Sequence, residues 1–133
     1  MDEKKIYAVY VDLLRMHKEF CKKEPVFSER EIFIQRINAI NLSHNSYFCY
    51  LMCEALRKWF LKNFIGITDT VKFYSELWHF HKAYLSQSIS ELEWEKIVNE
   101  ADKLSDMYGI DACNEMVLAI ITDLDSRIKQ AGE

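Results

Sequence analysis

The chain has 133 residues, of which half are hydrophobic and 14% are aromatic, and its formal net charge is -4 at pH 7. This composition is typical of one folded domain, residues 1–133, and argues against long disordered segments. One proline and three glycines supply too few turn residues for an all-β fold, and the acidic balance disfavours a broad phosphate-binding surface. We therefore expect an all-α domain that does not bind nucleic acid.

The cysteines and the N-terminal segment indicate the compartment. All four cysteines fall inside helical patterns, whereas a secreted disulfide scaffold places them in the loops of a shorter chain. The N-terminal segment lacks the pattern of a secretion signal, because Asp12 interrupts its apolar run. No apolar stretch is long enough for a membrane span, which needs about 20 residues. The sequence predicts reduced thiols in a cytoplasmic protein.

The first two predicted helices lie before residue 47. The first runs from about residue 3 to residue 22, and Pro25 follows it, because proline disfavours helical geometry at the preceding residue. Ser28 and Glu31 form a capping box that predicts the start of the second helix. The polar residues 41–46 are expected to connect it to the third helix, with a single kinked helix as the open alternative.

The third predicted helix, residues 46–63, is expected to be the centre of the bundle. On a helical wheel its apolar arc spans roughly 180°, wider than the stripe of about 100° that a surface helix needs. The arc predicts contact with several neighbours, and it carries Phe48, Cys49, Met52, Cys53, Leu56, Trp59, Phe60 and Phe64. Three apolar residues on the opposite, charged side predict a surface that meets another protein chain, namely Tyr50, Leu51 and Leu61.

The remaining helices are marked by clear start and stop signals. The fourth is expected over residues 70–85, and the fifth begins after Ser90, which starts a second capping box with Glu93. Gly109 is expected in the left-handed conformation at the end of the fifth helix, and Asp111 begins the sixth. The pattern therefore predicts a compact bundle of five to six amphipathic helices around the central helix.

One group of residues could bind a metal. His17 and Cys21, and likewise Cys49 and Cys53, are spaced four residues apart on buried arcs, so both members of each pair share a helix face. If the first and third helices pack together, the four side chains could converge on zinc. Structural zinc sites usually use Cys-x-x-Cys spacings, however, and free cysteine is commonly buried without a metal. We therefore expect no metal and no cofactor, with these four residues as the candidate set.

Two further histidine positions are of interest. Glu76 and His79 form a Glu-x-x-His motif of the kind that di-iron bundles use, but the chain has no second copy, so we interpret the motif as a solvated pair. His81 lies within an aromatic arc, where a buried histidine usually has a hydrogen-bond partner. We assign no family, because the motifs of helical nucleotide-binding ribonucleases, all-helical nucleotide pyrophosphatases and helix-turn-helix proteins do not fit the sequence.

The aromatic content favours one function over its alternatives. Tyr, Trp and Phe are enriched at interfaces, so we expect a non-enzymatic helical interaction module, an adaptor, inhibitor or regulator, that forms a homodimer. The alternative is a small helical metal- or ligand-binding protein or enzyme with a buried His/Cys site, built from His17, Cys21, Cys49, Cys53 and His81. Nucleic-acid binding has the weakest support, because the basic stripe Arg57, Lys58 and Lys62 lies on the most apolar helix.

Overall fold

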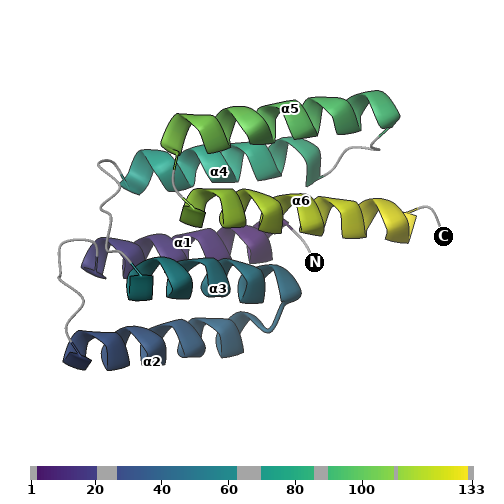
Figure 1. Cartoon of the computed structure of the whole chain (residues 1–133). Helices are drawn as coiled ribbons and strands as arrows, with labels where there is room; N and C mark the ends of the chain where they lie inside the picture. The colour runs from purple at the N-terminus through teal and green to yellow at the C-terminus, as the bar shows by residue number, and fades with distance from the viewer. Residues whose placement is uncertain (1–2, 21–26, 63–69, 86–89, 110, 132–133) are drawn as a thin grey trace.

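A computed structural model describes residues 3–20, 27–62, 70–85, 90–109 and 111–131, and the side chains of residues 27–29, 59–62 and 129–131 lie outside that description. The described residues form six helices and no strand (Figure 1). The helices are α1 (Glu3–Phe20), α2 (Phe27–His44), α3 (Tyr47–Lys62), α4 (Thr70–Leu85), α5 (Glu91–Tyr108) and α6 (Asp111–Ala131). The predicted all-α class is confirmed. Within these residues, no helix combines the length and the apolar character needed to cross a membrane.

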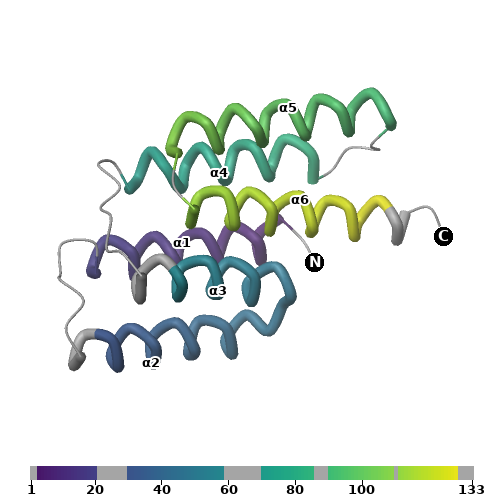
Figure 2. The backbone as a smooth tube through the Cα atoms, in the orientation of Figure 1, coloured from purple at the N-terminus to yellow at the C-terminus, as the bar shows by residue number. Residues whose placement is uncertain are grey.

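Five of the helices close a ring around the core. α1 packs against α2 and α4, α3 packs against α2 and α6, and α6 also packs against α4 and α5. The helices run roughly side by side, with α2 and α5 at opposite edges of the bundle (Figures 1 and 2). α3 and α6 therefore share the centre, and residues far apart in sequence meet inside the ring.

The apolar face of α3 lies in this core, as its wide arc predicts. The side chains of this face that the structure describes are all buried, namely Phe48, Cys49, Met52, Cys53 and Leu56. Trp59, Phe60 and Phe64 lie outside the described side chains. From α6 the core receives Met116, Ile120 and Leu124, which are also fully buried. The pairing of these two apolar faces positions the surface between α3 and α6, where the candidate site is found.

The connection between α2 and α3 is shorter than the predicted residues 41–46. α2 continues to His44, so only Asn45 and Ser46 separate the two helices. Asn45 has a φ of 47° and its N–H donates to the carbonyl of Asn41 at 2.9 Å. Asparagine tolerates the left-handed conformation better than most residues, which ends α2 abruptly. The polar character of residues 41–46 therefore reflects an exposed helix end rather than a loop.

Two contacts fix the ends of the helices at this junction. His44 Nε2 lies 2.7 Å from Asp12 Oδ2, which joins the last turn of α2 to α1. The Ser46 hydroxyl accepts a hydrogen bond from the Cys49 N–H at 3.2 Å and so satisfies a free amide in the first turn of α3. Sequence polarity alone does not show these contacts, because Asp12 lies 32 residues before His44.

Of the other predicted helix ends, those at Ser90 and Gly109 are confirmed and the one at Ser28 is wrong. The Ser90 hydroxyl accepts from the Glu93 N–H at 3.3 Å, so the predicted N-cap of α5 is confirmed. Gly109 has a φ of 60° and its N–H donates to the Ser105 carbonyl at 2.9 Å, as expected for the end of this helix. The start predicted at Ser28 is wrong, because α2 already includes Phe27.

Candidate functional site

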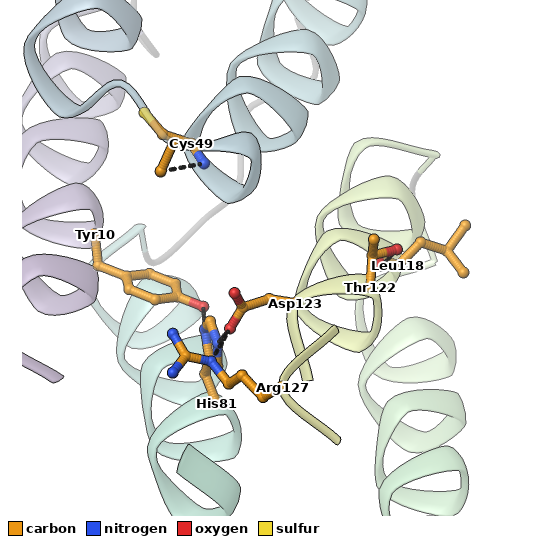
Figure 3. A network of polar contacts seen from close by, with 8 residues as sticks. Tyr10, Cys49, His81, Leu118, Thr122, Asp123 and Arg127 are labelled. Atoms are coloured by element: carbon orange, nitrogen blue, oxygen red, sulfur yellow. Dashed lines mark hydrogen bonds and ion pairs between the residues drawn. The ribbon is translucent and has the colours of Figure 1, made fainter. Parts of the chain in front are cut away.

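A chain of hydrogen bonds links α1, α4 and α6 inside the bundle. The Tyr10 hydroxyl lies 2.9 Å from His81 Nδ1, and His81 Nε2 lies 2.7 Å from Asp123 Oδ2 (Figure 3). The same carboxylate oxygen accepts from Arg127 Nε at 2.9 Å. The His81 side chain is fully buried, while those of Asp123 and Arg127 are 14% and 24% exposed. The chain therefore runs from the core at Tyr10 to the surface at Asp123 and Arg127.

The ionisation of these groups fixes the direction of each hydrogen bond. Burial lowers the pKa of His81, and the hydrogen bond to Asp123 opposes this effect only in part, so the imidazole is neutral near pH 7. Burial acts to raise the pKa of Asp123, but hydrogen bonds from His81 and Arg127 outweigh it and lower that pKa below its ordinary value. An ionised carboxylate only accepts, so Nε2 of His81 carries the proton and donates to Asp123. Nδ1 then accepts from the Tyr10 hydroxyl.

Aromatic rings hold the His81 imidazole in place. The Phe48 ring meets it edge-on with ring centroids 4.8 Å apart, and the Tyr10 ring does so at 5.9 Å. Such edge-to-face contacts add to the area that burial removes from water. A histidine held by two rings and two hydrogen bonds has one orientation, and it holds Asp123 in one orientation in turn.

Asp123 lines a pocket between α3 and α6. The pocket has a volume of about 260 Å³ and is lined by Tyr47, Phe48, Leu51, Thr122, Asp123, Ser126 and Arg127. Oδ2 of Asp123 accepts two hydrogen bonds, whereas Oδ1 accepts none of those found among the described residues. One carboxylate oxygen points toward His81 and Arg127 and the other points away from them (Figure 3). The pocket thus combines apolar walls with one fixed acceptor, as small-molecule sites do.

The order of groups is similar to that of a catalytic triad, but the chemistry differs. A nucleophile, a histidine and a carboxylate occur in sequence, and groups with shifted pKa values beside a cleft are candidates for function. Here the hydroxyl end of the chain is in the core, because Tyr10 is only 3% exposed and burial raises its pKa well above the ordinary value. The carboxylate end faces the pocket. The arrangement therefore suits binding at a fixed carboxylate better than nucleophilic attack.

The two helices that form this pocket also carry exposed or half-buried apolar side chains. Tyr47 and Tyr50 stack with ring centroids 6.1 Å apart, and both are exposed. Of the residues predicted to meet another chain, Tyr50 is exposed, Leu51 is half-buried and lines the pocket, and Leu61 lies outside the described side chains. Leu118 of α6 adds an exposed apolar side chain. We call Tyr47, Tyr50, Leu51 and Leu118 the seam surface.

The structure describes three of the four metal candidates, and it places His17 in other surroundings than Cys49 and Cys53. His17 Nδ1 lies 2.7 Å from the Tyr74 hydroxyl, and the rings meet edge-on. Cys49 and Cys53 have their sulfurs 3.9 Å apart. Cys21 lies outside the described residues. Within the part of the chain that the structure describes, no three His, Cys, Asp or Glu side chains are grouped in a way that would hold a metal ion.

The two thiols of α3 face the backbone of α2. Cys49 Sγ lies 3.9 Å from the Ile40 carbonyl and Cys53 Sγ lies 3.8 Å from the Ile37 carbonyl. The hydrogen bond with Cys49, together with burial, raises the pKa of the Cys53 thiol. A protonated thiol is a weak donor and neither a nucleophile nor a metal ligand. Among the described cysteines, Cys49, Cys53 and Cys113 form no disulfide, and the reduced state of the thiols stays a prediction.

Glu76 and His79 line a second pocket, between α4 and α5. Its volume is about 370 Å³ and its lining is Glu76, His79, Phe80, Glu100, Lys103 and Leu104. His79 Nδ1 lies 2.7 Å from the Ser75 carbonyl, one turn earlier on the same helix. The Tyr108 hydroxyl donates to Glu76 Oε2 at 3.1 Å. His79 is exposed and Glu76 partly so, in keeping with a solvated pair.

Sequence reasoning identified His81 and missed its partners. Tyr10 lies 71 residues before His81 and Asp123 lies 42 residues after it. The one local signal is the spacing of Asp123 and Arg127, four residues apart on α6, which favours an ion pair on one helix face. The chain matches no protein-family model, and neither the curated proteins nor the solved structures compared with it gave a match.

Proposed function

We propose that the chain is a non-enzymatic helical interaction module that pairs with a second copy of itself through the seam surface. One observation carries the proposal: the rings of Tyr47 and Tyr50 stack on each other although both side chains are exposed, and Tyr47 lines the pocket. Tyrosine is enriched at interfaces because its ring is apolar and its hydroxyl forms hydrogen bonds. Leu118, which is 59% exposed, adds an exposed apolar side chain from α6, the other helix of the pocket.

The charges beside the seam surface leave a second copy acceptable as the partner. Lys58 pairs with Glu115 at 2.9 Å, and Arg57 pairs with Glu54 at 3.7 Å. Each copy has a net charge of -4, so two copies repel each other where unpaired charges of the same sign meet. A face whose ions are already paired within the chain reduces that repulsion. A two-fold arrangement would place the same surface on both sides, as in most homodimers.

Measurement of the particle mass tests this proposal. Sedimentation equilibrium or native mass spectrometry should give twice the chain mass of 15.8 kDa. Tyr50→Glu and Leu118→Glu should each raise the dissociation constant at least about tenfold, because a carboxylate is then buried against apolar surface. Both positions are exposed in the single chain, so the fold itself should tolerate the changes.

A matched substitution on another face serves as the control. Leu92 is 65% exposed on α5, at the edge of the bundle, and Leu92→Glu should leave the dissociation constant unchanged. A wild-type chain that remains monomeric at roughly 100 µM would end the proposal. So would a dimer that Tyr50→Glu and Leu118→Glu weaken no more than Leu92→Glu does.

A further inference from the structure

The pocket between α3 and α6 presents an acceptor that cannot become a donor. Asp123 is held as a carboxylate by the His81 N–H and the Arg127 Nε–H, which both donate to Oδ2. A carboxylate has no proton to give, so Oδ1 can only accept. The orientation of the Asp123 carboxylate is fixed by His81, because His81 is fully buried between Tyr10 and Phe48. A molecule in the pocket therefore meets a rigid acceptor.

The charges of the pocket favour a neutral occupant. Asp123 and Arg127 form an ion pair at 2.9 Å, so the two formal charges on the pocket wall cancel. A cation would be attracted by Asp123 and repelled by Arg127, whereas an anion would be attracted by Arg127 and repelled by Asp123. A neutral hydrogen-bond donor meets neither penalty and satisfies Oδ1.

The remaining walls define the shape of the occupant. Phe48 and Leu51 are apolar, and Tyr47 adds a ring at the rim. The Thr122 hydroxyl donates to the Leu118 carbonyl at 2.8 Å, so its proton is already used. The volume of about 260 Å³ is just below the usual range for drug-sized ligands, so the pocket suits a single ring.

We propose that this pocket binds a neutral hydroxyaromatic group, whose hydroxyl donates to Asp123 Oδ1 and whose ring packs against Phe48, Leu51 and Tyr47. This site does not depend on self-association. Tyr50 does not line the pocket, so Tyr50→Glu separates the two proposals. Titrations in the Tyr50→Glu background, at a concentration where sedimentation gives the mass of one chain, measure the pocket without self-association.

Two probes that differ in one hydrogen-bond donor test the site. 4-Methylphenol carries the hydroxyl, and 4-methylanisole carries the same oxygen with its proton replaced by methyl. Chemical shift changes of backbone amides in α3 and α6 report the dissociation constants. We expect 4-methylphenol to bind at least about tenfold more tightly, because the ether leaves Oδ1 without a donor.

The substitution Asp123→Asn should abolish this preference. His81 and Arg127 both donate to one oxygen, so the amide oxygen must take that place and the amide N–H₂ must face the pocket. The pocket then offers a donor, and 4-methylanisole should bind at least as tightly as 4-methylphenol. Asp102→Asn, an exposed carboxylate on α5, is the matched control and should leave the tenfold preference unchanged.

A second variant keeps the test independent of the stability of Asp123→Asn. Ser126 is exposed and lines the pocket, so Ser126→Phe should fill it and abolish binding of both probes while the helical circular dichroism stays the same. Three results would overturn the proposal. These are equal affinity for the two probes, no saturable binding up to their solubility, and binding that Ser126→Phe leaves intact.

Discussion

His17 Nδ1 and the Tyr74 hydroxyl lie 2.7 Å apart, which joins α1 to α4 in a region where both side chains are almost completely buried. Burial lowers the pKa of His17 to about 4. Burial and the nearby Cys53 raise the pKa of the Tyr74 hydroxyl well above its ordinary value. Both groups are therefore neutral over the physiological range.

Acidification should destabilise the fold through His17. The unfolded chain binds a proton below about pH 6.5, whereas the folded chain binds it only below about pH 4, so the free energy of unfolding falls as the pH drops through this window. At pH 5 the loss from this group should be about 2 kcal/mol relative to pH 7.5. Urea denaturation at both pH values measures it. His17→Gln cannot titrate and should lose less by about that amount, and an identical pH dependence in the variant would contradict the prediction.

Tyr10→Phe should destabilise the fold by about 1–2 kcal/mol, because it removes the donor to His81 Nδ1 and leaves a buried nitrogen without its partner. Chemical denaturation at pH 7.5 measures the change. Tyr7→Phe is the control, since Tyr7 lies on the same helix with half of its surface exposed. Equal effects of the two substitutions would mean that the hydroxyl of Tyr10 contributes nothing to stability.

Leu56→Ala should lower the free energy of unfolding by about 2–5 kcal/mol, the usual range for a large core side chain. Lys58→Ala, two residues later on the exposed side of α3, should leave stability close to that of the wild type despite its ion pair with Glu115. Thermal and urea unfolding of both variants compare the two faces of the helix. A Leu56→Ala effect no larger than that of Lys58→Ala would show that this face is not packed.

Gly109→Ala should cost about 1–2 kcal/mol through backbone strain alone. The φ of 60° is unfavourable for any residue with a Cβ, and a Cβ built at this position meets no other atom within 4 Å. Gly109→Asn should cost less, because asparagine tolerates this conformation. Urea denaturation of the two variants separates strain from packing, and an alanine variant as stable as the wild type would exclude strain.

The sequence predicted the parts of the fold that are set by neighbouring residues. The cap at Ser90, the left-handed Gly109 and the buried face of α3 from Phe48 to Leu56 all follow from spacings of a few residues. The end of α2 was missed because Asn45 acts through its backbone conformation, which polarity does not reveal. Ser28 likewise matches a capping box, yet the helix begins earlier.

The candidate site was predictable only in fragments. His81 was expected to be buried with a partner, but its two partners come from helices that the sequence does not place beside α4. The pairing of Cys49 with Cys53 follows directly from their spacing, while the carbonyls they face belong to α2. Tyr50 and Leu51 were expected at a surface for another chain, and this remains a prediction.

The ring of helices has a consequence for synthesis on the ribosome. α1 precedes α4 and α6 in the chain, yet it packs against α4, and the ring cannot close until α6 has also been made. The part of the apolar face of α1 that meets α4 therefore stays without its native partner until α4 has been translated. Such a growing chain exposes an apolar segment that chaperones can bind, and the ring is expected to close only after α6 has left the ribosome.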